Sequence, residues 1–197
     1  MKKNVVLSML TMAMVVLFAS CAKVPQAEVD AANVAIDSAK VAEAAVYVPE
    51  QLAQVEDSLK SALAEVETQK SKFFSNYDNA TKTLVYVAET AKQVGVNAQA
   101  RKAQLKEEIV ALIAEVTNLV AENKELTKKA PKGKEGKAAL EAINAELAVV
   151  ETTVTESQAA YDNGQYVGTI DKIKAAKDKA VSIKDELTAA IEKVGKK

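Results

Sequence analysis

The chain has 197 residues with 26 basic and 27 acidic side chains, a net charge of −1, and a single arginine, Arg101. This balance lacks the basic footprint of a nucleic-acid-binding protein, and 4% aromatic residues leave much of the core packing to alanine. The chain has no histidine and one cysteine, so the commonest general base and the soft metal ligands are scarce, and we expect a non-enzymatic protein without a cofactor or metal.

The first 20 residues have the layout of a secretory signal peptide. Lys2 and Lys3 form a short basic head, and an apolar stretch of 14 residues runs from Val5 to Phe18. A helix that spans a bilayer needs roughly 20 apolar residues, so this stretch is too short for a permanent span. We therefore expect residues 1–20 to be removed from the mature protein.

Small residues stand directly before Cys21, in the segment "FASC". This segment resembles the bacterial lipobox, in which the signal peptide is cleaved before a cysteine whose thiol and new amino group are acylated. The resemblance implies that Cys21 is a lipidated N-terminus, followed by a short linker within residues 21–24. The alternatives are a residue without a role and a thiol that pairs between chains. Ala22 instead of aspartate favours the outer membrane, facing the periplasm, under the enterobacterial sorting rule.

From Val24 onwards the apolar residues recur at helical spacing, which predicts an all-α fold. The prolines stand where a helix begins or has just ended, with Pro25 and Pro49 in first turns and Pro131 after a C-terminus. Asn163 and Gly164 indicate a helix elbow with the glycine at the cap. These signals predict about five helices, at residues 25–45, 50–72, 76–128, 137–160 and 165–195.

The predicted third helix has coiled-coil spacing, because its apolar residues step by alternating threes and fours. In its second half this stripe consists of Leu105, Ile109, Leu112, Val116, Leu119, Asn123 and Leu126. A shift of the stripe after Arg101 indicates a change of packing partner. Asn123 is interpreted as a buried polar residue that fixes the helix register. Gly95 and Asn97 are poor helix formers, so a break there is the alternative to one continuous helix.

The helix lengths predict the architecture. At a rise of about 1.5 Å per residue, the third helix would reach roughly 80 Å, and each of the others roughly 30–45 Å. Short elbows make consecutive helices antiparallel. We therefore predict an elongated antiparallel helical bundle or coiled coil, in which two three-helix bundles share one long central helix. Its parts are the first helical hairpin with the central helix at 25–128, a basic loop at 129–136, and a C-terminal hairpin at 137–197.

The segment at residues 27–67 reads "AEVDAANVAIDSAKVAEAAVYVPEQLAQVEDSLKSALAEVE". It contains an alanine-rich helix, then a tyrosine and "PE" followed by leucine, then a second helix. In these features it resembles the bacterial lipoprotein domain catalogued as domain of unknown function 4398. The resemblance implies an envelope lipoprotein and brings no catalytic residues.

Two groups of side chains stand out at the predicted elbows. The aromatic residues there are expected to close the ends of a narrow bundle, and they are Tyr47, Phe73, Phe74, Tyr77, Tyr161 and Tyr166. The segment at 124–139 carries six lysines against two glutamates: Lys124, Lys128, Lys129, Lys132, Lys134 and Lys137. It is either a solvated loop or a contact for an anionic surface such as cell wall or lipid head groups.

These observations predict an envelope lipoprotein that acts as a helical spacer or scaffold and presents an interaction surface away from its membrane. Its expected partners are the membrane, through the lipid, and the cell wall or another envelope protein, with no nucleic acid. The alternative is a helical-repeat, tetratricopeptide-like module that binds a peptide of an envelope complex.

Overall fold

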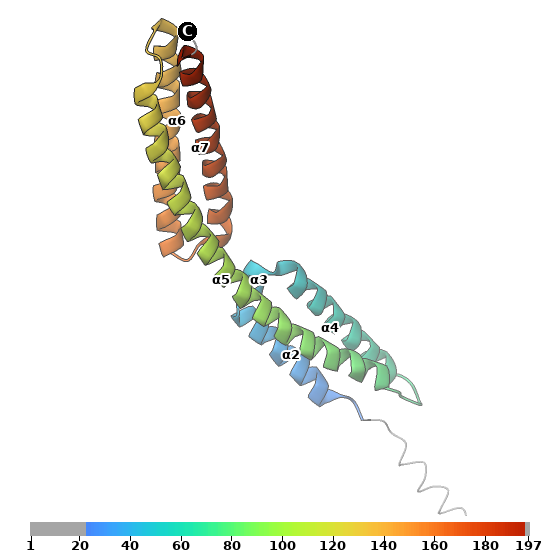
Figure 1. Ribbon diagram of the computed structural model, residues 1–197. Coiled ribbons are helices and arrows are strands. Elements are labelled where there is room, and N and C mark those ends of the chain that lie inside the picture. The colour runs from blue at the N-terminus through green and yellow to red at the C-terminus, as the bar shows by residue number, and fades with distance from the viewer. Residues whose placement is uncertain (1–22, 196–197) are drawn as a thin grey trace, which may run out of the picture. The chain divides into compact units, whose positions relative to one another are not determined.

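The computed structural model describes residues 23–195, with the backbone alone for Lys134, Glu135 and Gly195 (Figure 1). Throughout this range the chain is helical apart from short connections, and it contains no strand. The helices are α2 (Gln26–Val41), α3 (Ala44–Tyr47), α4 (Pro49–Lys70), α5 (Asp78–Lys129), α6 (Lys134–Asp162) and α7 (Tyr166–Gly195). The predicted all-α fold class is confirmed, whereas the predicted count of five helices is wrong, because residues 23–195 contain six.

The additional helix arises because the predicted helix at 25–45 is interrupted after Val41. Glu43 has a left-handed backbone conformation, with φ 62° and ψ 29°, which ends the helical path. The short helix α3 follows and buries Tyr47. Glutamate is not one of the residues that usually adopt this conformation, so the local sequence carries no signal for the break. Pro49 lies in the first turn of α4, as predicted.

The chain divides into two compact units, with the boundary between Gln99 and Ala100. Unit 1 contains α2, α3, α4 and the first part of α5, and unit 2 contains the second part of α5 together with α6 and α7. Helix α5 has 52 residues and stays helical through Gly95 and Asn97. The break considered at those two residues therefore does not occur.

Unit 1 packs around small side chains. Its buried alanines are Ala32, Ala35, Ala39, Ala44, Ala62, Ala80, Ala88, Ala91 and Ala98. They let the helices lie close together, since an ideal Cβ on Gly95 of α5 would lie 3.5 Å from the Cα of Ala39 in α2. Asn97 of α5 donates a hydrogen bond of 2.8 Å to Gln51 of α4. The poor helix former Asn97 is thus held by a contact between helices.

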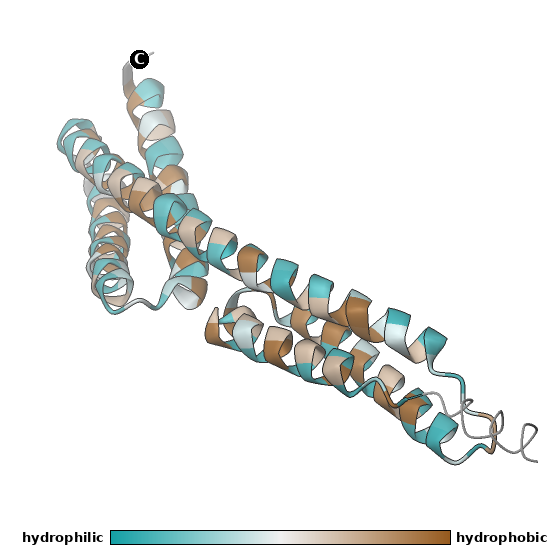
Figure 2. Ribbon diagram, turned by 90° about the horizontal axis from the view of Figure 1, so that it is seen from below, coloured by the Kyte–Doolittle hydropathy of each residue, from teal (hydrophilic) through white to brown (hydrophobic). Residues whose placement is uncertain are grey.

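Unit 2 has larger buried side chains. They include Leu105, Ile109, Leu147, Ile173, Ile183 and Leu187. Three ion pairs of 2.6 to 2.8 Å join α7 to α5, and their members are Lys174 with Glu108, Lys177 with Glu115 and Lys184 with Glu122. Residue numbers rise together along both helices, so α5 and α7 run in the same direction. Hydrophobic and hydrophilic residues are interspersed along the helices, as in amphipathic helices that turn one apolar face to the core (Figure 2).

The aromatic residues at the elbows do not behave alike. Tyr47, Tyr77 and Tyr166 are buried, as expected for side chains that close the ends of a helical bundle. Phe73 and Phe74 are instead 93% and 77% exposed. The prediction that aromatic side chains cover the core at every elbow is therefore wrong for these two phenylalanines, because Tyr77 already occupies the buried position at that end of unit 1.

Candidate functional site

The predicted lipid anchor, Cys21, lies outside the described residues, as does the signal peptide at 1–20. The described chain begins at Lys23, three residues before the start of α2. None of the helices that the structure describes combines the length and the apolar character needed to cross a bilayer.

The lysine-rich segment covers the end of α5, the connection to α6 and the beginning of α6. Helix α5 ends at Lys129, and the N–H of Ala130 still donates to the carbonyl of Leu126 at 3.0 Å. The methyl group of Ala130 is buried in a hydrophobic cluster with Leu147, Ile183 and Leu187. This contact holds the connection against the core of unit 2.

A glycine allows α6 to begin so soon after α5 ends. An ideal Cβ on Gly136 would lie 2.2 Å from the carbonyl oxygen of Pro131, a distance that no real side chain tolerates. Pro131 itself cannot continue α5, because it lacks an N–H and its ring clashes with the preceding turn. Pro131 and Gly136 therefore lie in close contact where the chain leaves α5 and enters α6.

Two of the six lysines are engaged in ion pairs. Lys124 pairs across the helices with Glu151 of α6, and Lys128 contacts Glu125 of its own helix at 2.5 Å. The hydrogen bond from Lys128 lowers the pKa of Glu125, and the positive charges of Lys128 and Lys129 act in the same direction. These two lysines therefore add less to the positive charge of the segment than their number suggests.

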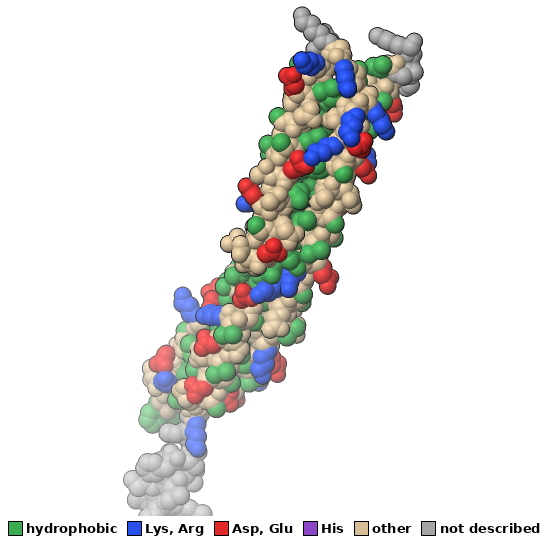
Figure 3. Space-filling view, turned by 90° about the vertical axis from the view of Figure 1, so that its left-hand side faces the viewer, with side chains coloured by type: hydrophobic (Ala, Val, Ile, Leu, Met, Phe, Trp, Pro, Cys, Tyr) green, Lys and Arg blue, Asp and Glu red, His purple; other side chains and the backbone are tan. Residues whose placement is uncertain are grey.

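Three other lysines of the segment are exposed, namely Lys129, Lys132 and Lys137. No ion pair joins them to any side chain that the structure describes. The structure does not describe the side chain of Lys134. Figure 3 shows lysine side chains gathered at this end of unit 2, with carboxylates between them. The structure thus leaves a smaller basic surface than the six predicted residues, centred on the connection itself.

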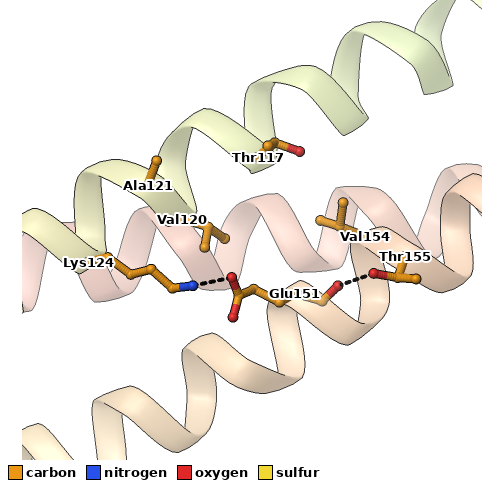
Figure 4. Close-up of a pocket in the computed structure, with 7 residues that line it drawn as sticks. All are labelled: Thr117, Val120, Ala121, Lys124, Glu151, Val154 and Thr155. Carbon is orange, nitrogen blue, oxygen red and sulfur yellow. Dashed lines mark hydrogen bonds and ion pairs between the residues drawn. The ribbon is translucent and has the colours of Figure 1, made fainter.

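A groove of about 300 Å³ lies between α5 and α6. Its apolar lining comes from Val120 and Ala121 of α5 and Val154 of α6, and the pair formed by Lys124 and Glu151 lies at one end (Figure 4). Apolar walls with one charged pair suit an aliphatic side chain of a partner. Sequence reasoning missed this groove, because Glu151 follows Lys124 by 27 residues and no local pattern links them.

Lys40 of α2 lies on the surface and pairs with Glu56 of α4 at 2.6 Å. The hydrogen bond to Glu56 raises the pKa of Lys40, as in an ordinary surface ion pair. Residues 23–195 hold no cluster of three or more histidine, cysteine, aspartate or glutamate side chains placed to bind a metal ion.

Comparison with known proteins finds no matching family model, no similar curated protein and no similar solved structure. The resemblance of residues 27–67 to the lipoprotein domain therefore stays a prediction.

Proposed function

We propose that the protein is a lipid-anchored lipoprotein of the cell envelope, held at the outer membrane and facing the periplasm, that serves as a non-enzymatic helical spacer. The observation that carries the proposal is the position of Cys21, directly behind a 14-residue apolar stretch and directly before an all-helical chain. Acylation of both the thiol and the new amino group of this cysteine would supply more than one lipid chain. Stable anchoring needs at least two membrane signals, so the mature protein would stay on its membrane.

Helix α5 supports the spacer role. Its 52 residues contribute to both compact units without interruption, so one hydrogen-bonded element joins the lipid-proximal unit to the unit that carries the basic segment. We propose that two three-helix bundles share this helix in an elongated protein. The basic segment at the connection of α5 and α6 would then face away from the membrane, towards cell wall or another envelope component.

The alternative function is a tetratricopeptide-like module that binds a peptide, and the groove between α5 and α6 favours it. Small-angle X-ray scattering of residues 22–197 separates the two. A compact domain of this length has a radius of gyration of about 16 Å. A rod as long as a straight 52-residue helix, roughly 78 Å, has a radius of gyration of at least roughly 23 Å. We expect the larger value, and a value near 16 Å would exclude the spacer.

The exposed lysines provide the test of the distal contact. Replacement of Lys129, Lys132 and Lys137 by glutamine removes three charges without touching the ion pairs of Lys124 and Lys128. A lysine near an anionic surface contributes about 1 kcal/mol, so binding to isolated cell wall should weaken on the order of 100-fold. The wild-type binding should also fall with added salt.

A matched control for this experiment is the replacement of Lys60, Lys82 and Lys172 by glutamine, which changes the net charge equally at other exposed positions. The control variant should bind like the wild type, and circular dichroism should show the same helix content for both. Equal loss of binding in both variants would mean that net charge matters and the segment does not.

A further inference from the structure

The connection between α4 and α5 carries two exposed phenylalanines at its tip. Phe73 and Phe74 are 93% and 77% exposed, and their rings meet edge to face with centroids 4.9 Å apart and planes at 87°. Together they form one apolar surface, here called the phenylalanine tip. Side chains of this size normally lose most of their contact with water in a folded protein, so the exposure of two neighbours marks a contact surface.

The phenylalanine tip is held in place by hydrogen bonds within the connection. The hydroxyl of Ser75 donates to the carbonyl of Gln69 at 3.0 Å, and the N–H of Asn76 donates to the side chain of Gln69 at 3.2 Å. The side chain of Asn76 in turn accepts from the N–H of Asp78 at 2.9 Å, at the start of α5. Because the backbone is tied at these points and Tyr77 fills the end of the core, the two phenylalanines are left to point outwards.

The phenylalanine tip lies at the end of unit 1 where α2 begins. Asn79 at the start of α5 donates to Glu65 near the end of α4 at 2.8 Å, so these two helices are antiparallel. Ala27 and Ala31 of α2 line a groove with Val85 of α5, which places the start of α2 beside the start of α5. Figure 1 shows the beginning of α2 and the connection between α4 and α5 at the same end of the unit.

The length of chain between Cys21 and α2 limits how far the phenylalanine tip can be from a lipid on that cysteine. Only four residues separate Cys21 from Gln26, the first residue of α2. Even fully extended, this stretch spans at most roughly 18 Å. An acyl chain on Cys21 would therefore hold this end of unit 1 within reach of the interfacial layer of the membrane.

We propose that Phe73 and Phe74 insert into the interface of the bilayer that holds the lipidated Cys21. The inference rests on the proposed function, because the lipid brings this end of unit 1 to the membrane. Exposed aromatic side chains lower their free energy by entering the boundary between head groups and acyl chains. Lys72, which is exposed beside them, can remain among the head groups. The protein thus has a second membrane contact, which limits rotation of unit 1 about its lipid linkage.

Tryptophan fluorescence tests the insertion, because the chain contains no tryptophan. The full chain with Phe73→Trp is produced in a bacterium that acylates lipoproteins, purified, and reconstituted into vesicles that contain brominated phospholipid. We expect its emission to shift to shorter wavelength and to be quenched by the bromine. The control is Val41→Trp, at the other end of α2, where the native side chain is 86% exposed, and its emission should show neither change.

The intact mass of the same sample reports acylation of Cys21, so the anchor and the phenylalanine tip are tested separately. Acylated protein in which Phe73→Trp and Val41→Trp give the same unquenched emission would overturn the insertion and leave the anchor in place. Quenching without acylation would support the insertion and overturn the anchor.

A blue shift in detergent-free solution without vesicles, growing with protein concentration, would mean that the tip contacts a second copy, and this result would also overturn the proposal. Phe74→Trp, as a second probe, should give the same result as Phe73→Trp.

Discussion

Replacement of Cys21 by serine is expected to abolish acylation, and to leave the protein either as an uncleaved precursor or free of its membrane. A hydroxyl group cannot take the place of the thiol that the lipid modification requires. Each buried CH₂ of an acyl chain contributes about 0.8 kcal/mol to membrane binding, so the loss of all chains removes nearly the whole attachment. Metabolic labelling with a fatty-acid probe, followed by membrane fractionation, measures both effects.

The matched control for this substitution is Ser20→Ala, which keeps a small residue before the cysteine. This variant should be labelled and fractionate with the membrane like the parent. A Cys21→Ser protein that is processed and membrane-bound as the parent is would show that the anchor assignment is wrong.

The substitution Asn123→Asp is expected to destabilise unit 2 by about 3 kcal/mol or more at neutral pH. Asn123 is completely buried, and its side-chain amide donates a 2.7 Å hydrogen bond to the carbonyl of Ala180 in α7. A carboxylate at this position cannot donate that bond, and it places a negative charge against the carbonyl oxygen. Urea unfolding of the variant and the wild type measures the difference in the free energy of unfolding.

The pH dependence of this difference follows from the burial. Burial raises the folded-state pKa of the introduced carboxyl above its unfolded value of about 3.9. Below a pH of about 3.9 the introduced carboxyl is protonated and neutral in both the folded and the unfolded state, so the substitution costs little stability there. The cost grows as the pH rises from the unfolded pKa to the folded pKa, and it is complete above the latter.

The substitution Asn123→Leu serves as the control, because it removes the amide and introduces no charge. Leucine loses the hydrogen bond to Ala180, but it also removes a buried Oδ1 atom that has no hydrogen-bond partner, so the stability should stay within about 1 kcal/mol of the wild type. If Asn123→Asp were as stable as the wild type at neutral pH, the side chain at this position could not be buried as described.

The sequence was sufficient to predict the features that depend on neighbouring residues. Pro49 starts α4 where its fixed backbone angle and missing N–H cost little. Gly164 adopts φ 78° after the end of α6, at the elbow that it was predicted to cap. The long helix follows from apolar spacing that is helical on both sides of the shift after Arg101, and the predicted stripe residues Leu105, Ile109 and Val116 are all buried.

The predicted set of buried residues along α5 was only partly correct. The predicted position Leu119 is half-buried, whereas its neighbour Val120 is buried. A coiled-coil seam between two helices buries a narrow stripe, but a helix with two neighbours buries a broader one. Since α5 contacts α6 through Lys124 and Glu151 and contacts α7 through Asn123, its buried face includes residues that the seam pattern excludes.

The sequence by itself determined the helical class and most helix ends, because helix periodicity and helix caps depend on residues close together along the chain. Only the tertiary structure decided which side chains at the helix ends meet. It interrupted the first helix at Glu43 and paired Lys124 with Glu151. It also directed Tyr77 into the core and Phe73 and Phe74 outwards. These outcomes depend on the space and the charges that other helices present, and residues distant in the sequence supply both.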